Sequence, residues 1–360
     1  MTQPTTKGLV PNVKFHSTNQ FRNAVKNIQT KARFKGLDEE GDPIIDETAI
    51  APTLAYTGTV KLHGTNASII LHEDGAISFH SKNNILGAID NNGEFLLNSD
   101  NAKFAQTMWR RKEAVYEIAT YAETLCMNIL GDVEYPIKIS GEWCGYGAQS
   151  KVGISFLPTK SLFIFGIKVQ DEWLPVKEIS SVCCDQSGIY NIMNFPTKSV
   201  TIDFNNPAYS QNELVEATDA VEEKCPVSKQ LGIEQSLLGE GLVWIPNDPE
   251  LAKDSGNWFK TKGEKHSVSK TKSVAAVCPE KLNSIKEFVE YACTDNRMEQ
   301  GIGEVGLNQK DIGTFIGWVN KDINKEEGDV LESNNLTMKD VGKYTANKAR
   351  MFFLSKLNKM

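Results

Sequence analysis

The sequence predicts an α+β protein, because strand-like segments dominate its first three quarters and helix-like segments dominate the remainder. Residues 54–85 alternate apolar and polar side chains, are rich in Thr, Val, Ile and Phe, and contain a turn at Glu73-Asp74-Gly75. Further strand-like runs lie at 137–140, 162–167, 242–245 and 258–260. Because strands come first and helices follow, the two kinds of element are expected to separate rather than to alternate.

Helical spacing of apolar residues predicts a long helix over 102–130 and three helices near the C-terminus. These last helices are expected at 282–292, 309–319 and 337–357. Thr337 and Asp340 have the spacing of an N-terminal capping pair for the final helix. Residues 178–206 lack a regular period and are interpreted as an insertion or connector, and a domain boundary is expected near 273–279.

The length of 360 residues is too great for one small core and predicts two domains. No apolar run approaches the length that spans a bilayer, and no signal peptide is visible, so we expect a cytoplasmic protein without a membrane partner. Seven cysteines without a Cys-x-x-Cys pair argue against a disulfide framework and favour a reducing compartment. Five histidines without His-x-x-x-His spacing argue against structural zinc.

Charge is unevenly distributed along the chain. A net charge of −7 excludes a globally basic nucleic-acid binder, yet the residues before Asp38 contain seven Lys or Arg and no acid, and 260–272 is also cationic. For the first stretch, phosphate binding and a solvated face are both open. Its composition resembles that of a mitochondrial presequence, but its apolar residues favour a folded segment over 1–50 that packs on the next domain. These are Val13, Phe15, Phe21, Val25 and Ile28.

Lys61 is the first candidate for chemistry. It lies in Thr59-Val60-Lys61-Leu62-His63-Gly64-Thr65-Asn66, where a glycine follows the lysine three residues on in a strand-rich region. An amine in such a place can lie against a nucleotide phosphate and attack the phosphorus, which holds the nucleotide covalently. Lys-x-x-Gly occurs by chance in many chains, so the significance of Lys61 depends on residues further along.

Five further segments follow Lys61 in an order that supports this chemistry. They are Ser81-Lys82-Asn83, Glu142 in Gly141-Glu142-Trp143-Cys144-Gly145, Phe163 with Phe165, Glu240 between Gly239 and Gly241, and Lys260 with Lys262. Lys260 and Lys262 point to one face of a strand, where they can neutralise phosphate charge. The carboxylates can hold a divalent ion that bridges phosphate oxygens, and an aromatic ring can stack on a purine.

Together these segments resemble the motifs of the covalent nucleotidyltransferases, which comprise ATP-dependent RNA and DNA ligases and mRNA-capping guanylyltransferases. The matches are Lys61 to Asn66 for motif I, Lys82 for Ia, Glu142 for III, Phe165 for IIIa, Glu240 for IV, and Lys260 with Lys262 for V. His63-Gly64-Thr65-Asn66 is most similar to the bacteriophage RNA ligase 2 family. Residues 291–297, 302–306 and 310–313 resemble the helical C-terminal domain of that family, so the resemblance covers about 54–330.

The resemblance implies an ATP-grasp-like adenylyltransferase domain of antiparallel sheets flanked by helices over 51–272, and a small all-α domain over 273–360. It implies ATP with Mg²⁺ or Mn²⁺ as cofactors. Lys61 would take AMP from ATP, a 5′-phosphate RNA end would accept the AMP, and a 3′-hydroxyl would displace it. The implied substrate is a nick or bridged break in duplex RNA, as in RNA repair, and a monomer is expected.

The resemblance also implies roles for single residues. Three lysines would be catalytic, namely Lys61, Lys260 and Lys262. The nucleotide would be bound by His63 at the pyrophosphate, Lys82 and Glu142 at the sugar, Phe165 at adenine, and Glu240, which would also hold the metal ion. Arg297 and Asp322 match positions that engage RNA ends, and a structural ion pair between them explains their presence about equally well.

Two alternatives to an RNA ligase stay open. A DNA ligase or capping guanylyltransferase would carry the same motifs, but those enzymes have an OB-fold after motif V, where helices are predicted here. A catalytically silent RNA-end-binding protein would not need the intact set of lysines and acids. If the protein is phage-encoded, the host cytoplasm is the expected location, and a mitochondrial one is less favoured.

The deprotonation of Lys61 is a separate question. No general base stands out near Lys61 in the sequence. We therefore expect Lys260, Lys262 and the metal ion to lower the pKa of the Lys61 amine, because neighbouring positive charge disfavours its protonated form.

Overall fold

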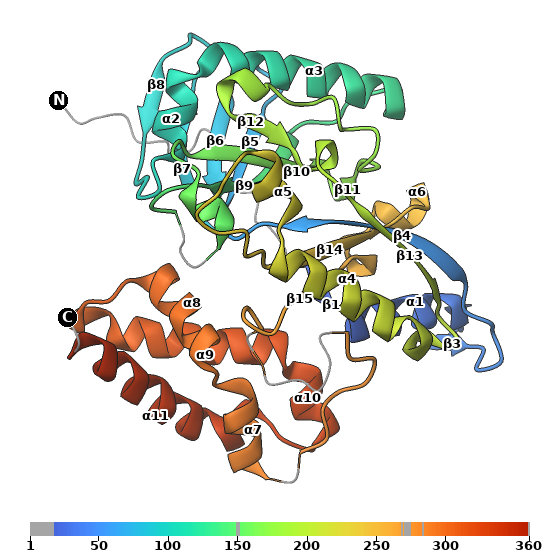
Figure 1. Ribbon diagram of the computed structural model, residues 1–360. Coiled ribbons are helices and arrows are strands. Elements are labelled where there is room, and N and C mark those ends of the chain that lie inside the picture. The colour runs from blue at the N-terminus through green and yellow to red at the C-terminus, as the bar shows by residue number, and fades with distance from the viewer. Residues whose placement is uncertain (1–17, 149–151, 268, 270–274, 283, 359–360) are drawn as a thin grey trace.

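The computed structural model describes residues 18–148, 152–267, 269, 275–282 and 284–358. It is an α+β structure, as the sequence predicts, in which two large sheets of mostly antiparallel strands are flanked by helices and a helical region follows them (Figure 1). Within the described residues, no helix is long and apolar enough to cross a membrane.

The smaller of the two large sheets carries Lys61 at the end of a strand. Its order over the described residues is β1-β15-β14-β4-β13. The strands are β1 (Asn19–Gln20), β4 (Thr53–Lys61), β13 (Lys198–Asp203), β14 (Gly241–Pro246) and β15 (Phe259–Lys262). All neighbours are antiparallel except β1 and β15. Because β14 lies between β4 and β15, the end of β4 meets the start of β14 and the end of β15, although β4 is far from both in sequence.

The larger sheet has the order β11-β10-β9-β5-β6-β7-β8 over the described residues, with β12 added beside β10. Its strands are β5 (Thr65–Leu71), β6 (Ile77–Ser81), β7 (Ile85–Ile89), β8 (Phe95–Leu97), β9 (Ile137–Cys144), β10 (Ser161–Val169), β11 (Glu172–Trp173) and β12 (Ile189–Asn191). A separate hairpin is formed by β2 (Phe34–Leu37) and β3 (Pro43–Ile45). The strands predicted within 54–85 are thus shared between the two large sheets.

Two helices cover one face of the larger sheet (Figure 1). They are α2 (Phe104–Arg110) and α3 (Lys112–Leu130). Ile118 of α3 is buried in one cluster with Ile69 and other strand residues. The prediction of one helix over 102–130 is wrong, because the helix is interrupted at Arg111, where ψ is 28°. The Arg111 guanidinium donates a hydrogen bond to the carbonyl of Lys160. This tertiary contact cannot be predicted from a local sequence pattern.

Four helices accompany the smaller sheet, namely α1 (Phe21–Arg33), α4 (Gln211–Glu223), α5 (Pro226–Gln230) and α6 (Pro249–Ala252). The apolar side chains Phe21, Val25 and Ile28 of α1 are buried, and the Phe21 ring lies 4.8 Å from that of Phe259. On α4, the Thr218 hydroxyl is 2.7 Å from that of Thr261 on β15. The other apolar residues singled out before Asp38, Val13 and Phe15, lie outside the described residues.

The interpretation of 178–206 as an insertion or connector is wrong for two of its segments. Residues 189–191 form β12, which pairs with β10, and 198–203 form β13, which pairs with β4. In β13, Val200 and Ile202 are buried while their neighbours are exposed or half-buried. This alternation is present in the sequence, but strands this short at a sheet edge give a weak pattern.

The C-terminal region consists of α7 (Ile285–Ala292), α8 (Asp295–Val305), α9 (Ile312–Glu326), α10 (Gly328–Ser333) and α11 (Met338–Leu357). Phe288, Phe315 and Phe353 are buried in its own core. The capping box of Thr337 and Asp340 is formed. Residues 270–274 are outside the described residues, so the predicted division at 272 and 273 falls there.

Helix α8 was not predicted, because Gly301 and Gly303 weaken helix propensity within it. Gly301 is required by packing, since a Cβ there would lie 2.8 Å from both the Phe315 and the Trp318 rings. The glycine that weakens the local pattern therefore lets α8 lie close against α9.

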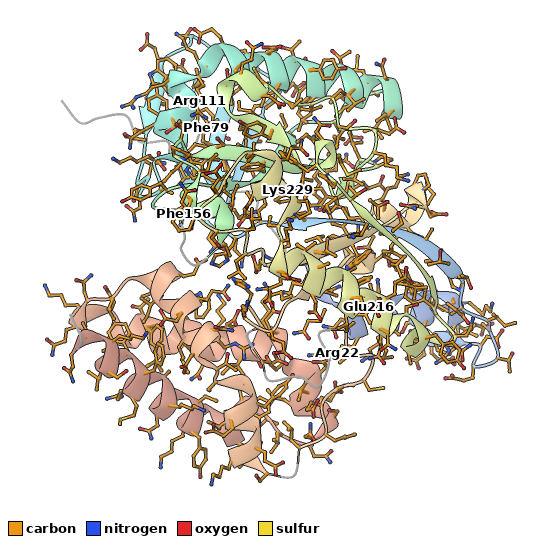
Figure 2. The ribbon with its side chains drawn as sticks, in the orientation of Figure 1. Arg22, Phe79, Arg111, Phe156, Glu216 and Lys229 are labelled. Carbon is orange, nitrogen blue, oxygen red and sulfur yellow. The ribbon has the colours of Figure 1, made fainter. Side chains whose placement is uncertain are left out.

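The helical region packs against the end of the smaller sheet. Figure 2 shows Arg22 where α1 meets the C-terminal helices. The Arg22 guanidinium is 3.2 Å from Glu327 and 2.5 Å from Asp329, and Asn296 donates to the carbonyl of Ser267. These contacts place the C-terminal helices beside the strand end that bears Lys61.

Candidate active site

Lys61 is the last residue of β4, and its register partner on β14 is Gly241. The Lys61 side chain is 23% exposed, and its Nζ lies 2.8 Å from the Glu240 Oε2. The predicted nucleophile is therefore partly buried and ion-paired at the junction of two strands.

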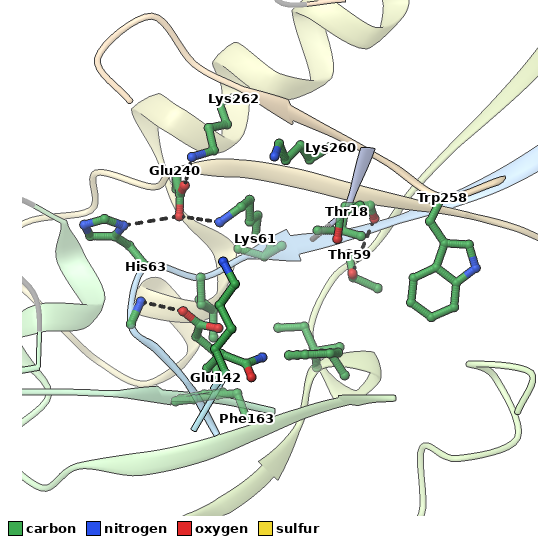
Figure 3. Close-up of a pocket in the computed structure, with 18 of the residues that line it drawn as sticks. Thr18, Thr59, Lys61, His63, Glu142, Phe163, Glu240, Trp258, Lys260 and Lys262 are labelled. Carbon is green, nitrogen blue, oxygen red and sulfur yellow. Dashed lines mark hydrogen bonds and ion pairs between the residues drawn. The ribbon is translucent and has the colours of Figure 1, made fainter. Parts of the chain in front are cut away.

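Glu240 is surrounded by three basic side chains (Figure 3). Its Oε2 lies 2.8 Å from Lys61 and 3.4 Å from the His63 Nδ1, and its Oε1 lies 2.9 Å from the Lys262 Nζ. Burial raises the pKa of the Glu240 carboxyl, but Lys262 and Lys61 lower it by more, so the pKa lies well below its usual range. Glu240 is thus an ionised, 2% exposed carboxylate that organises both lysines.

Glu240 can occupy this position because glycine follows it. Gly241 has φ of +150°, a conformation that side-chain-bearing residues rarely adopt. A Cβ at Gly241 would lie 2.1 Å from the Thr261 carbonyl oxygen on β15. The glycine seen beside Glu240 in the sequence is therefore needed for close strand pairing at the site.

The expectation that neighbouring cations lower the pKa of Lys61 is wrong for this structure. Burial lowers the pKa of the Lys61 amine, but the Glu240 carboxylate raises it by more, so the pKa lies above its ordinary value. Burial does lower the pKa of Lys262. Lys61 and Lys260 lower the pKa of Lys262 further, whereas Lys61 lies near a second carboxylate, that of Glu142, which raises its pKa.

Glu142 projects from β9, where its register partners are Asn66 on β5 and Phe163 on β10. Its Oε1 accepts a hydrogen bond of 2.9 Å from the Gly64 backbone amide. A Cβ at Gly64 would lie 2.5 Å from the Trp143 carbonyl oxygen, so the glycine of motif I allows this approach. Burial, opposed by Lys61, raises the pKa of Glu142 to about 7. The site thus holds one strong acid and one weak acid.

Glu142→Gln is expected to change how stability depends on pH. From its ordinary value of 4.5 up to about 7, the unfolded carboxyl is ionised while the folded one keeps its proton. Unfolding then releases a proton, so the wild-type free energy of unfolding falls as pH rises through this window, whereas that of the variant does not. Above pH 7 the variant should be more stable by on the order of 1–3 kcal/mol.

Urea unfolding of both proteins at several pH values between about 5 and 8 measures this difference. Glu73→Gln, at an exposed turn, is the control and should follow the wild type. Parallel pH profiles for the wild type and Glu142→Gln would contradict the raised pKa.

Two aromatic side chains of β10 line the site, and the structure distinguishes them. Phe163 is 1% exposed, and its ring stacks on that of Tyr190 at 5.1 Å. Phe165 is half-buried and lies at a bulge, where the pairing of β10 with β9 shifts between Ile164 and Gly166. The two rings are two residues apart on β10, and this spacing places them on one face of the strand, so both line the pocket.

The predicted residues converge on a pocket of about 230 Å³. On the scale of roughly 10–15 Å³ per water, it holds more than a single ion. Its basic side chains are Lys61, His63, Lys82, Lys260 and Lys262. Its apolar wall includes Val60, Phe163, Phe165, Val243 and Trp258. A pocket with both cationic and apolar side chains fits a purine nucleotide, whose phosphates and base need these two environments.

An unpartnered polar atom supports the same interpretation. The Asn66 Oδ1 is buried at the pocket without a hydrogen-bond partner among the described residues. Buried polar oxygens are normally paired, so this one is available to a ligand. Asn66 belongs to the motif I segment but was given no separate role.

Lys82 lies at the rim of the pocket, in the turn after β6, and is exposed. The predicted sugar contact therefore depends on a side chain for which no hydrogen bond or ion pair is present among the described residues. Lys260 differs, since its Nζ lies 2.8 and 3.1 Å from the two carboxylate oxygens of Glu326 on α9. Glu326 was not predicted, because no local pattern connects it with motif V.

Arg297 and Asp322 form an ion pair of 2.9 Å, which is the structural alternative that the sequence left open. The Arg297 side chain is fully buried and also lies 3.1 Å from Glu327. In this arrangement Arg297 cannot contact RNA, whereas Asp322 lines the pocket. The predicted pair is brought together, but only its acid faces the site.

A divalent ion fits Glu240 under one condition. No group of three or more His, Cys, Asp or Glu side chains in the described part of the chain could hold a metal ion. Mg²⁺ commonly binds through one or two carboxylates, water and substrate phosphates rather than a protein cage. Glu240 therefore suits an ion that is bound together with substrate phosphates. Its two carboxylate oxygens would then give up their contacts with Lys61 and Lys262.

Fold and pocket define an α+β protein whose lysine-lined site lies between two sheets and a helical region. A sequence model of the RNA ligase family matches residues 55–262, which is more than half of the chain and includes Lys61, Glu240 and Lys262. The chain therefore belongs to the RNA ligase family.

Solved structures of RNA ligase from Naegleria gruberi are distantly similar. The enzyme with PPi and a mutant with AMP and Mn are each 15% identical over 70% of this chain and 56% of that chain, with TM-scores of 0.42. A mutant with ATP and Mn is 14% identical over 69% and 56%, with the same TM-score. The chain thus spans little more than half the length of these ligases. No curated protein matches it.

Proposed function

We propose that the protein is an ATP-dependent RNA ligase of the RNA ligase 2 type. The observation that carries the proposal is the Lys61 amine, held on Glu240 beside Lys262 in a pocket that suits a nucleotide. The ion pair with Glu240 holds the Lys61 ammonium in place, and after loss of a proton the amine can act as the nucleophile toward a phosphate.

In the first step, the Lys61 Nζ attacks the α-phosphorus of ATP. An N–P bond forms, the bond from phosphorus to the pyrophosphate oxygen breaks, and the amine loses its proton. A 5′-phosphate oxygen of RNA then takes the AMP from Lys61. Finally, a 3′-hydroxyl attacks that 5′-phosphorus and releases AMP, which closes the strand.

The pocket residues divide this work. Lys262 and Lys260 neutralise phosphate charge, and His63 lies beside Glu240 where the pyrophosphate would leave. When bound, a Mg²⁺ or Mn²⁺ ion at Glu240 supplies positive charge to the phosphate oxygens. When Lys61 leaves Glu240, it loses the negative charge that raises its pKa. The amine then loses its proton more readily.

Three further side chains would bind the nucleoside. Glu142, Lys82 and Phe165 line the pocket, where the first two would contact the sugar and Phe165 would stack on adenine. Phe163 completes the same wall, so the two rings share the apolar contact. The proposed acceptor is a 5′-phosphate beside a 3′-hydroxyl in nicked duplex RNA, sealed by a monomer in RNA repair.

The test has two parts. Incubation with α-labelled ATP and Mg²⁺ or Mn²⁺ should give a labelled protein whose phosphoramidate bond is lost in acid, and a nicked RNA duplex should then be sealed. Labelling by GTP, or sealing of DNA nicks alone, would instead identify a capping-type enzyme or a DNA ligase. Tight binding of RNA ends without any labelling would indicate a silent RNA-binding protein.

A further inference from the structure

The ion pair between Lys260 and Glu326 joins the two regions of the protein at the active site. Glu326 is the last residue of α9, and its side chain is 12% exposed, against 13% for Lys260. Both carboxylate oxygens of Glu326 contact the Lys260 Nζ, at 2.8 and 3.1 Å. Burial opposes ionisation of Glu326, but Lys260 lowers its pKa to about 2. The pair is therefore a fully charged contact with restricted access to water.

Neighbouring contacts hold Glu326 in place. Its backbone carbonyl accepts from Gln20 and from Arg22, at 3.2 Å each. The next residue, Glu327, is fully buried and is held by Arg22 and Arg297. Asp329 binds the same Arg22 guanidinium. The N-terminal helix α1 thus anchors the end of α9, so that Glu326 points at Lys260.

The consequence for the pocket is an acidic wall. Three acids of the helical region line it, namely Glu304, Asp322 and Glu326, together with the neutral Gln300. Carboxylates repel the polyphosphate of ATP at short range. In addition, Glu326 takes two of the three N–H donors of the Lys260 ammonium, which leaves one for a phosphate oxygen. The closed arrangement therefore favours an empty pocket over one filled with ATP.

We propose that Glu326 is an internal stand-in for a phosphate, which holds the helical region closed on Lys260 until ATP phosphates displace it. The proposal rests on the ligase function proposed above and adds a regulatory step to it. Nucleotide binding and opening of the helical region are coupled, because both act on one lysine. Opening after ATP binding would also clear the site for an RNA end.

The coupling predicts tighter ATP binding when the contact is weakened. Glu326→Gln removes the charge but keeps a hydrogen-bond acceptor of the same shape. If the closed form is populated at about 90% without nucleotide, the variant should bind ATP roughly tenfold more tightly, since less of the protein must first open. Asp329→Asn weakens the anchor at Arg22 outside the pocket and should shift ATP affinity in the same direction by less.

The experiment uses the full chain with Lys61→Arg added, so that ATP is bound but not consumed. Calorimetry gives ATP affinity, and small-angle X-ray scattering gives the radius of gyration with and without ATP. ATP should increase the radius in the Lys61→Arg background, and Glu326→Gln should have the larger radius already without ATP. Glu332→Gln, an exposed acid on α10, is the charge-matched control and should behave as the background.

An unchanged radius on adding ATP, or ATP binding by Glu326→Gln no tighter than that of the control, would overturn the latch. If ATP binds more tightly to Glu326→Gln but not to Asp329→Asn, the effect of Glu326 is local repulsion of the phosphates. That result would also reject coupling between ATP binding and opening of the helical region. These readouts need no chemistry, so they are separate from failure of the proposed function, which would appear as a wild-type protein that never becomes labelled.

Discussion

Lys61→Arg is expected to abolish transfer of AMP to the protein. Arginine keeps the positive charge beside the buried Glu240 carboxylate. It can therefore form an ion pair in place of the Lys61 contact of 2.8 Å and preserve the junction of the two strands. However, a guanidinium is not deprotonated in proteins, and therefore it cannot act as the nucleophile. Loss of a nucleophile commonly lowers the rate by roughly 10⁴- to 10⁶-fold. The measurement is the rate of protein labelling by α-labelled ATP.

The matched control for this substitution is Lys168→Arg. Lys168 is another largely buried lysine with a carboxylate partner, Asp171 at 3.1 Å, but it is not among the pocket residues. The Lys168→Arg variant should be labelled by α-labelled ATP at the same rate as the wild type. A second comparison uses RNA that already carries a 5′-adenylate, which Lys61→Arg should still seal, because the last step does not use the amine as nucleophile. Labelling of Lys61→Arg would exclude Lys61 as the nucleotide carrier.

Arg297→Met is expected to have the largest effect on stability. The substitution keeps much of the side-chain volume but removes a fully buried charge that binds Glu327 and Asp322. Arg297 also donates to the Ala292 carbonyl, which would be left without this donor. Removing one member of a buried ionic network typically costs about 3–5 kcal/mol, because the remaining charges stay buried without compensation.

Urea unfolding followed by circular dichroism measures the loss, with the exposed Arg350→Met as the control. If Arg297 instead engages RNA directly, the variant should be as stable as the wild type, accept AMP normally and fail at sealing. The stability measurement therefore separates the structural role that the burial of Arg297 supports from the RNA contact that the family resemblance implies.

Much of the site could be predicted because its residues lie in patterned strands. Lys260 and Lys262 share a strand face through the two-residue period, and the glycines beside Glu240 and Glu142 indicated close backbone approach. The sequence pattern did not predict the secondary structure where tertiary packing overrides local helix propensity. The glycines of α8 lower its helix propensity, and Arg111, where the predicted long helix is interrupted, contacts the carbonyl of Lys160, 49 residues away.

The charge state of the site required the three-dimensional structure. Sequence order suggested that lysines surround Lys61 and lower its pKa. In the structure, the Glu240 carboxylate lies 2.8 Å from the Lys61 amine and raises its pKa instead. Glu142 appeared equivalent to Glu240 as a glycine-flanked acid, yet burial leaves it with a pKa of about 7 while two lysines keep Glu240 ionised.

The sequence alone determined the α+β class, the order of the motifs and the residues that chemistry needs, because residue type and strand period are local properties. Tertiary structure decided which charges meet. Glu326 lies 66 residues beyond Lys260 with no pattern connecting them, and the anchor at Arg22 connects α1 to residues 307 positions away. Coulomb interactions depend on distance and burial, and both are set by how the helical region packs on the sheets.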